Sequence, residues 1–307
     1  MLLDRRAALM AGMAAALPTT SGLAAVAEAR RFDISLAEWS LHRSIQSGAI
    51  KHLDVAQIAR RQFGIDAVEH VSELWGAPVS DRVYRRELAR RLDGEGVKSL
   101  LIMRGHDQIL GHQDAEIRKV AVADHLQWLD VAAEMGCHSL RVFALSTGPS
   151  LLQRMQTTAE SLGKLCAAAA ERKLSILIEN HNGNSSNVEW LLGLIAMTDA
   201  PNLGTLPDFG NWNIGDQSFE IRRDAYAGVA ALMPFARGVS AKSFAFDSLG
   251  QETSIDYARM MQVVLGTGFR GHVGIEYEGA SPDEIRGIRA TSALLLANRE
   301  SAENHRP

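Results

Sequence analysis

The chain has 307 residues, of which 46% are hydrophobic and 22% charged, and its formal net charge is -4. This composition is that of a globular protein large enough to bury a substantial core without a metal or disulfide to hold it together. The body of the chain contains no run of basic residues. Nucleic acid is therefore not an expected partner, because binding a phosphate backbone requires clustered lysines and arginines.

Residues 1–30 are predicted to be a twin-arginine (Tat) export signal with its leader. Arg5 and Arg6 precede an apolar, alanine-rich stretch at residues 10–17, and an Ala-x-Ala-like sequence follows at residues 24–27. The apolar stretch is too short to span a bilayer, so no stable membrane anchor is expected. An ordinary amphipathic N-terminal helix is the alternative. The export signal predicts a periplasmic protein.

The chain has two cysteines, Cys137 and Cys166. In an oxidising compartment they would permit one disulfide. Two buried thiols that pack as small apolar groups are the preferred interpretation.

From residue 33 onward, short apolar runs alternate with longer helical patterns. Most of these runs are continuous in isoleucine, valine and leucine, which is typical of parallel strands covered by helices. Eight strands are predicted, at residues 33–39, 66–71, 98–103, 139–144, 175–180, 203–209, 238–246 and 272–277. The helices predicted between and after them are residues 53–63, 81–92, 114–135, 151–172, 188–197, 221–233, 255–265 and 282–297.

An unbroken series of eight strand-then-helix units predicts an α/β fold, a single (β/α)₈ TIM barrel, over residues 31–299. Glycine stands between a helix and the next strand at Gly64, Gly96, Gly136 and Gly268, where a helix cap is expected. An open, doubly wound sheet is the alternative, but no Gly-x-Gly-x-x-Gly turn follows the first strand. Residues 300–307 form a polar tail that is expected to be disordered.

Three of the later strands end abruptly in a carboxylate: Glu179, Asp208 and Glu276. Active sites of such barrels lie at the carboxyl ends of the strands, so these side chains are expected to converge. Unpaired, they would repel one another strongly, and a shared divalent cation would remove that repulsion. Oxygen ligands favour Mn²⁺ or Mg²⁺, with Co²⁺ and Zn²⁺ as alternatives. Carboxylates that are neutralised separately are the competing interpretation.

Four segments that surround these residues resemble the sugar phosphate isomerase/epimerase family, one of the xylose-isomerase-like TIM barrels. The segments are Glu-Asn-His at 179–181, Leu-Pro-Asp-Phe-Gly-Asn at 206–211, Val-Ser-Ala-Lys-Ser at 239–243 and Gly-Ile-Glu-Tyr-Glu-Gly at 274–279. The resemblance extends across the chain after the leader. It implies the barrel fold and a sugar substrate, but it does not specify which sugar.

The resemblance also implies a metal held by Glu, Asp, His and Glu from the last four strands. Glu179, Asp208 and Glu276 match three of these ligands, but Ser240 stands where the strand-seven histidine is usual. The fourth ligand is therefore open. His181, two residues beyond Glu179, is the candidate metal ligand from the loop, and water is the alternative.

By the same resemblance, Glu179 and Glu276 are expected to be the acid/base pair that moves a proton beside a carbonyl through an enediolate intermediate. His181 is a further candidate catalytic group. Lys242 is expected either to donate to the substrate oxygen or to form a structural ion pair with Asp208 or Glu276. The expected substrate-binding residues are Trp39, Glu69, His106 and Asn211. Arg141, on the fourth strand, needs a partner if it lies inside the barrel.

The leading functional hypothesis is a metal-dependent isomerase or epimerase that acts on a non-phosphorylated sugar or sugar derivative. The same residues would also serve a lyase or hydrolase acting on a 3-keto-glycoside. A periplasmic sugar-binding barrel without catalytic activity is a third hypothesis, because Ser240 replaces a ligand and a fold does not guarantee activity. An abasic-site endonuclease is disfavoured, since the chain lacks a histidine-rich multimetal site and a basic face. A homo-oligomer is compatible with this class of barrel.

Overall fold

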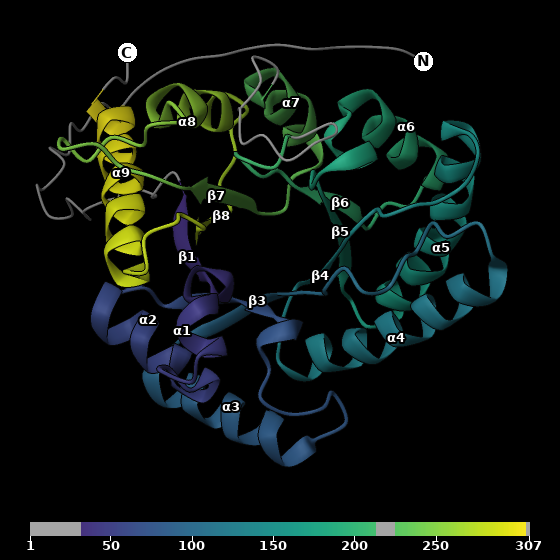
Figure 1. Cartoon of the computed structure of the whole chain (residues 1–307), viewed down its shortest axis with the longest axis horizontal. Helices are drawn as coiled ribbons and strands as arrows, with labels where there is room; N and C mark the ends of the chain where they lie inside the picture. The colour runs from purple at the N-terminus through teal and green to yellow at the C-terminus, as the bar shows by residue number, and fades with distance from the viewer. Residues whose placement is uncertain (1–31, 213–224, 305–307) are drawn as a thin grey trace, which may run out of the picture. The chain divides into compact units, whose positions relative to one another are not determined.

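Eight parallel strands form a ring that is surrounded by helices (Figure 1). The computed structural model describes residues 32–212 and 225–304. The strands are β1 (Asp33–Ala37), β2 (Ala67–Val71), β3 (Lys98–Met103), β4 (Ser139–Val142), β5 (Ser175–Glu179), β6 (Leu203–Leu206), β7 (Val239–Ser243) and β8 (His272–Tyr277). The α-helices are α1 (His42–Gln46), α2 (Val55–Phe63), α3 (Arg82–Glu95), α4 (Ala115–Glu134), α5 (Leu151–Glu171), α6 (Val188–Thr198), α7 (Ala225–Leu232), α8 (Tyr257–Gly266) and α9 (Glu284–Asn304).

The sheet is continuous in the order β6-β5-β4-β3-β2-β1-β8-β7, and every strand pair is parallel. Contacts between β6 and β7 close the ring. Ser240 N donates to the carbonyl of Pro207 at 2.9 Å, and Phe209 N donates to the carbonyl of Ser240 at 3.1 Å. The architecture is therefore the predicted (β/α)₈ barrel, with its closure beside Asp208 and Ser240.

The predicted strands all form, and five of them end one to three residues earlier than expected. Gly64 and Gly96 cap α2 and α3 with positive φ angles of 69° and 63°, the left-handed conformation that favours glycine. Helix α9 continues to Asn304, past the predicted end of the barrel at residue 299. None of the helices in the described ranges is long and apolar enough to cross a membrane.

The barrel has two apolar cores because successive residues of a strand point to opposite faces. A small inner core fills the barrel with side chains that include Val71, Leu101 and Leu177. A larger outer core packs the other face of the strands against the helices. Cys137 and Cys166 are both buried and free in this structure, as preferred from the sequence, and burial raises the pKa of each thiol to about 12.

The predicted export signal at residues 1–30 lies outside the described residues, as do residues 221–224 of the sixth predicted helix. The domain boundary at residue 31 therefore remains a prediction.

Candidate metal centre at the barrel mouth

Glu179, Asp208 and Glu276 meet inside the carboxyl end of the barrel, as the sequence predicts. Each offers one carboxylate oxygen to a group whose members all lie within 4.8 Å of one another. All three residues are at most 4% exposed. Their convergence follows from strand geometry: each carboxylate is on the inward face at or just beyond the end of β5, β6 or β8, and parallel strands end at one rim.

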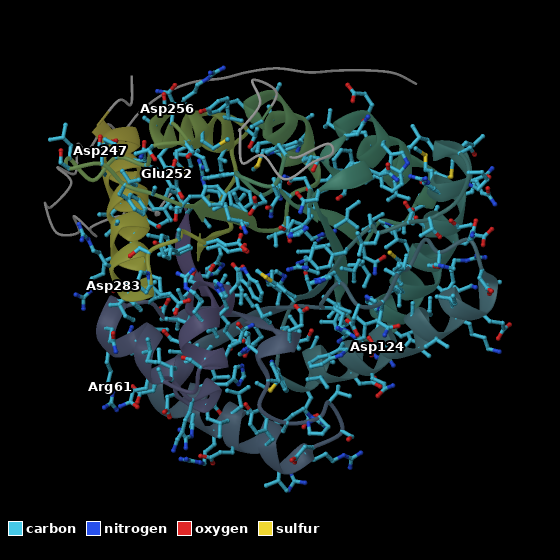
Figure 2. The ribbon with its side chains drawn as sticks, viewed as in Figure 1. Arg61, Asp124, Asp247, Glu252, Asp256 and Asp283 are labelled. Carbon is cyan, nitrogen blue, oxygen red and sulfur yellow. The ribbon has the colours of Figure 1, made fainter. Side chains whose placement is uncertain are left out.

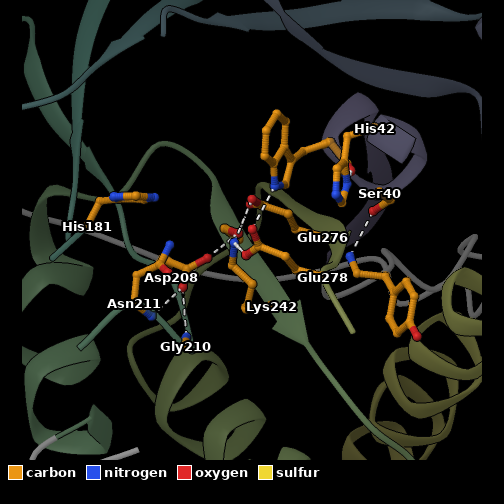
Figure 3. A network of polar contacts seen from close by, with 12 residues as sticks. Ser40, His42, His181, Asp208, Gly210, Asn211, Lys242, Glu276 and Glu278 are labelled. Carbon is orange, nitrogen blue, oxygen red and sulfur yellow. Dashed lines mark hydrogen bonds and ion pairs between the residues drawn. The ribbon is translucent and has the colours of Figure 1, made fainter. Parts of the chain in front are cut away.

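Each carboxylate has one oxygen held by a fixed donor of the protein. Asp208 Oδ1 accepts from the backbone N–H groups of Gly210 and Asn211, at 2.7 and 2.8 Å. The amide of Asn211 donates to Glu179 Oε1 at 3.0 Å. Lys242 Nζ donates to Glu276 Oε1 at 2.8 Å (Figure 3). The protein therefore orients all three groups and leaves their second oxygens for another partner.

The second oxygens have few partners of their own. Glu179 Oε2 is buried without a hydrogen bond, although it lies 3.0 Å from Arg141 Nε, which is not aligned to donate. Asp208 Oδ2 and Glu276 Oε2 share one hydroxyl, that of Ser240, at 2.6 and 2.5 Å. This set of incompletely satisfied oxygens, at the ends of three strands, is the donor set that a hard divalent cation requires.

Lys242 is the principal cation of the site. Its ammonium bridges Glu276 Oε1 and Glu278 Oε2 at 2.8 Å each, and the residue is 1% exposed. Gly210 packs against this side chain, and a Cβ there would lie 2.6 Å from Lys242 Cγ. Of the two predicted partners, Glu276 is therefore confirmed. Glu278 is a second partner that was not predicted, although its place two residues after Glu276, just beyond the end of β8, puts both on one side.

The three carboxyl groups of the site differ in pKa. Burial raises the pKa of Glu179 to about 8 against the opposing effect of Arg141, with Glu276 and Asp208 adding to the rise. Burial also raises the pKa of Asp208 to about 6 against the pull of Lys242. For Glu276, burial is outweighed by Lys242 and by the Ser240 hydroxyl, and its pKa falls to about 2. Without a cation, Glu179 favours the neutral form at neutral pH, whereas Asp208 and Glu276 favour the ionised form.

His181 does not join the three carboxylates, contrary to the prediction that it is a metal ligand. Its backbone N–H is held by Ser185 Oγ at 3.0 Å, and its ring packs edge-on against Phe143 with centroids 4.6 Å apart. Burial, with Lys242 and Arg141 nearby, lowers the pKa of His181 to about 3. A neutral imidazole therefore lies beside the site (Figure 3).

The other predicted substrate-binding residues take different positions. Trp39 lies at the mouth, where its indole N–H donates to Glu278 Oε1 at 3.0 Å and its ring stacks on His42. His106 is 69% exposed on the rim, with its ring edge-on to Phe143. Asn211 is 8% exposed and holds Glu179 and Asp208, so it supports the candidate metal ligands.

Glu69, an expected substrate-binding residue, does not lie at the carboxyl end of its strand. It lies in the middle of β2 on the inward face, where Ser35 Oγ donates to its Oε1 at 2.6 Å and its buried Oε2 has no partner. Gly274 on β8 makes room for it, since a Cβ there would lie 2.4 Å from Glu69 Oε1. Burial raises the pKa of Glu69 to about 7 despite the hydrogen bond from Ser35.

Glu69 is expected to make the protein less stable as the pH rises. Because its pKa is raised on folding from 4.5 to about 7, the folded state binds more protons across that window, and the associated stability is lost as pH rises through it. The change is on the order of 2–3 kcal/mol between pH 5 and pH 8. Urea unfolding at both pH values should show a smaller loss in Glu69→Gln than in the parent. Equal losses in the two proteins would contradict the assignment.

A second buried cluster lies between the barrel wall and the helices. Glu38 accepts from Val71 N–H at 2.8 Å, and its two oxygens lie 2.7 Å from His70 Nδ1 and 3.0 Å from His52 Nε2. The remaining ring nitrogens contact Ser99 Oγ at 2.8 Å and Tyr84 OH at 2.7 Å. The side chains of Glu38, His52 and His70 could also hold a metal. However, every polar atom of the cluster already has a partner in the protein, and the cluster joins the 3-10 turns at residues 38–41 and 52–54 to β2, β3 and α3.

Arg141 has the partner that its place inside the barrel requires, and His125, His138 and Trp128 make structural contacts. Arg141 points into the barrel beside Glu179, with its guanidinium 4.2 Å from the centre of the Phe143 ring. His125 Nδ1 is 2.7 Å from the carbonyl of Ala121 within α4, and Trp128 packs edge-on against Trp75. His138 is bonded to Ser139 Oγ at the start of β4.

The chain belongs to the xylose isomerase-like TIM barrel family, whose sequence profile matches residues 57–297. No curated protein sequence matches the chain.

Solved structures with the same fold include several that act on sugars. A 3-keto-D-glucoside 4-epimerase from E. coli is 17% identical to this chain, with a TM-score of 0.66. The match covers 88% of this chain and 99% of the epimerase chain. An L-ribulose 3-epimerase is 16% identical with a TM-score of 0.72, covering 90% and 100%. A xylose isomerase-like barrel from Mycobacterium smegmatis, solved in complex with magnesium, is 16% identical with a TM-score of 0.64, covering 89% and 98%. At these identities the likeness shows the shared fold.

Proposed function

We propose that the protein is a divalent-metal-dependent epimerase or isomerase of a non-phosphorylated keto sugar or sugar derivative. The observation that supports this most directly is the group of three buried carboxylates whose inward oxygens lack sufficient partners. The structural neighbours add support, because several are sugar epimerases.

The proposed chemistry is removal of a proton next to a carbonyl group, followed by its return. Glu179 and Glu276 are the acid/base pair, one accepting the proton and the other returning it. Lys242 and the neutral imidazole of His181 lie beside them as donors to the substrate oxygens. Trp39 and Phe143 provide apolar ring faces at the mouth for the sugar.

The residues that would hold the cation are Glu179, Asp208 and Glu276. When bound, a divalent ion would polarise the carbonyl group and stabilise the negative charge of the enediolate. Mn²⁺, Mg²⁺, Co²⁺ and Zn²⁺ are the candidate ions.

A lyase or hydrolase that acts on a 3-keto-glycoside is the second candidate. Its first step would also be removal of a proton next to the carbonyl group, here from C2. The negative charge would then expel the substituent at C1, and no proton would return to C2. The similarity to a 3-keto-D-glucoside epimerase favours keto-glycosides as substrates to test.

We also propose that the protein works in the periplasm. Arg5 and Arg6 before the apolar stretch are the features that support export. Fusion of residues 1–30 to a reporter that is active only after folded export would test this, with Arg5→Lys/Arg6→Lys as the control that should retain the reporter in the cytoplasm.

The experiment that tests the proposed function combines metal content with hydrogen exchange. About one equivalent of metal per chain is expected, with incorporation of deuterium from D₂O into a keto sugar or 3-keto-glycoside. Release of the aglycone in the same assay would identify the lyase. A protein that binds sugar but takes up no metal, even after reconstitution, would instead be a binding protein without this chemistry.

Lys242→Met is expected to separate metal binding from catalysis. Removing the ammonium beside Glu276 removes a repulsive charge, so the variant should bind the cation at least as tightly as the parent. Turnover should nevertheless fall on the order of 10²–10³-fold, because a donor to the developing negative charge is lost. Metal titration and steady-state rates at saturating metal measure the two effects. Unchanged turnover would leave Lys242 with only the structural ion pair.

A further inference from the structure

Ser240 is a polar residue that is buried against two of the three carboxylates. It lies on the inward face of β7, in register with Gly274 of β8, and is fully buried. Its hydroxyl oxygen is 2.6 Å from Asp208 Oδ2 and 2.5 Å from Glu276 Oε2. A side chain from β7 therefore reaches two of the three carboxylates through the very oxygens that no backbone or lysine donor holds.

These contacts exceed what one hydroxyl can satisfy as a donor. A serine hydroxyl has one proton, so it can donate to only one of the two carboxylates at a time. The hydroxyl oxygen and the oxygen of the second carboxylate then lie at hydrogen-bond distance with no proton between them, and their lone pairs repel. Only protonation of that second carboxyl group would relieve the repulsion. A cation among these oxygens removes the conflict, because the hydroxyl oxygen also has lone pairs to offer.

We propose that Ser240 Oγ is the fourth protein ligand of the cation, so that this chain binds a hard ion, Mg²⁺ or Mn²⁺, through oxygen atoms alone. The inference rests on the proposed function, since it concerns the same centre. Glu179, Asp208 and Glu276 supply the other ligands, and His181 is turned toward Phe143. Hard divalent ions prefer oxygen ligands, whereas zinc favours sites with nitrogen or sulfur donors.

Replacing Ser240 by cysteine tests the assignment with a change of one atom. A thiolate ligand is soft, so the variant should shift preference from Mn²⁺ toward Zn²⁺ by roughly tenfold or more, equivalent to about 1.4 kcal/mol. With Co²⁺ the variant should also show a thiolate-to-cobalt charge-transfer band, which arises only when the sulfur is bound to the ion. Ser240→Ala should weaken Mn²⁺ binding by about tenfold.

Ser35→Cys is the matched control. Ser35 is also a fully buried, inward-facing strand serine bonded to a glutamate, but that glutamate is Glu69, outside the ligand group. Its metal preference and cobalt spectrum should equal those of the parent, whose own Cys137 and Cys166 are buried elsewhere. Competition dialysis of the mature protein with equimolar Mn²⁺ and Zn²⁺ gives the preference.

The outcomes separate the two proposals. Mn²⁺ binding that is lost or weakened in Ser240→Ala, together with the cobalt–thiolate band in Ser240→Cys, supports serine ligation. Metal binding by the parent that is unchanged in Ser240→Ala, with no such band in Ser240→Cys, overturns the role of Ser240 but leaves the metal centre and the proposed function intact. A parent protein that binds neither ion overturns both.

Discussion

Glu179→Gln and Glu276→Gln are each expected to lower turnover of a keto-sugar substrate on the order of 10³-fold or more, with loss of the bound metal. Glutamine has nearly the shape of glutamate, but it has no negative charge for the cation and does not accept a proton at neutral pH. Both a ligand and one member of the acid/base pair are lost in a single change. Metal analysis, deuterium exchange into substrate and steady-state rates measure the effect.

Glu171→Gln is the control for these two variants. Glu171 ends α5 with an 81% exposed side chain and is not a member of the group of three carboxylates. It should retain both metal and turnover. If Glu179→Gln or Glu276→Gln retained full activity, the acid/base assignment would be wrong, whereas retained metal with lost activity would restrict that residue to proton transfer.

Glu38→Ala is expected to lower the free energy of unfolding by about 3–5 kcal/mol, the range seen when one partner of a buried charged network is removed. The change leaves His52 Nε2, His70 Nδ1 and the Val71 N–H without their acceptor in an environment that excludes water. Urea and thermal unfolding of the two proteins at pH 7 measure the difference.

The pH dependence provides a second test of Glu38. Burial opposes its ionisation, but His52 and His70 outweigh burial and hold its pKa well below the usual 4.5. Because the pKa is lowered on folding, the stability it contributes is present above 4.5 and is lost as pH falls toward the folded pKa. The difference between the parent and Glu38→Ala should therefore shrink below pH 4.5.

Glu95→Ala is the control for Glu38, because Glu95 pairs with Arg61 on the outer surface of α2 and α3 (Figure 2). Ion pairs open to solvent add little to stability, so Glu95→Ala should lower the free energy of unfolding much less than Glu38→Ala does. A similar loss of unfolding free energy in both variants would mean that the contribution of Glu38 to stability does not depend on its burial.

The sequence by itself determined the eight strands, their order and the convergence of three carboxylates. These follow from local rules: continuous apolar runs form covered parallel strands, and parallel strands carry their terminal side chains to one rim. The burial of Cys137 and Cys166 could also be predicted from the sequence, because free thiols commonly pack as small apolar groups.

Only the tertiary structure decided which groups pair. Glu69 and His70 are neighbours in the sequence, yet one points into the barrel toward Ser35 and the other out toward Glu38. Lys242 contacts Glu278 as well as Glu276, and Ser240 lies between Asp208 and Glu276. These pairings depend on the register of β7 against β8 and on how the ring closes at β6, which are relations between segments far apart in the chain. Local sequence patterns carry the direction of a side chain only relative to its own strand, and the partner it meets depends on the position of every other strand in the ring.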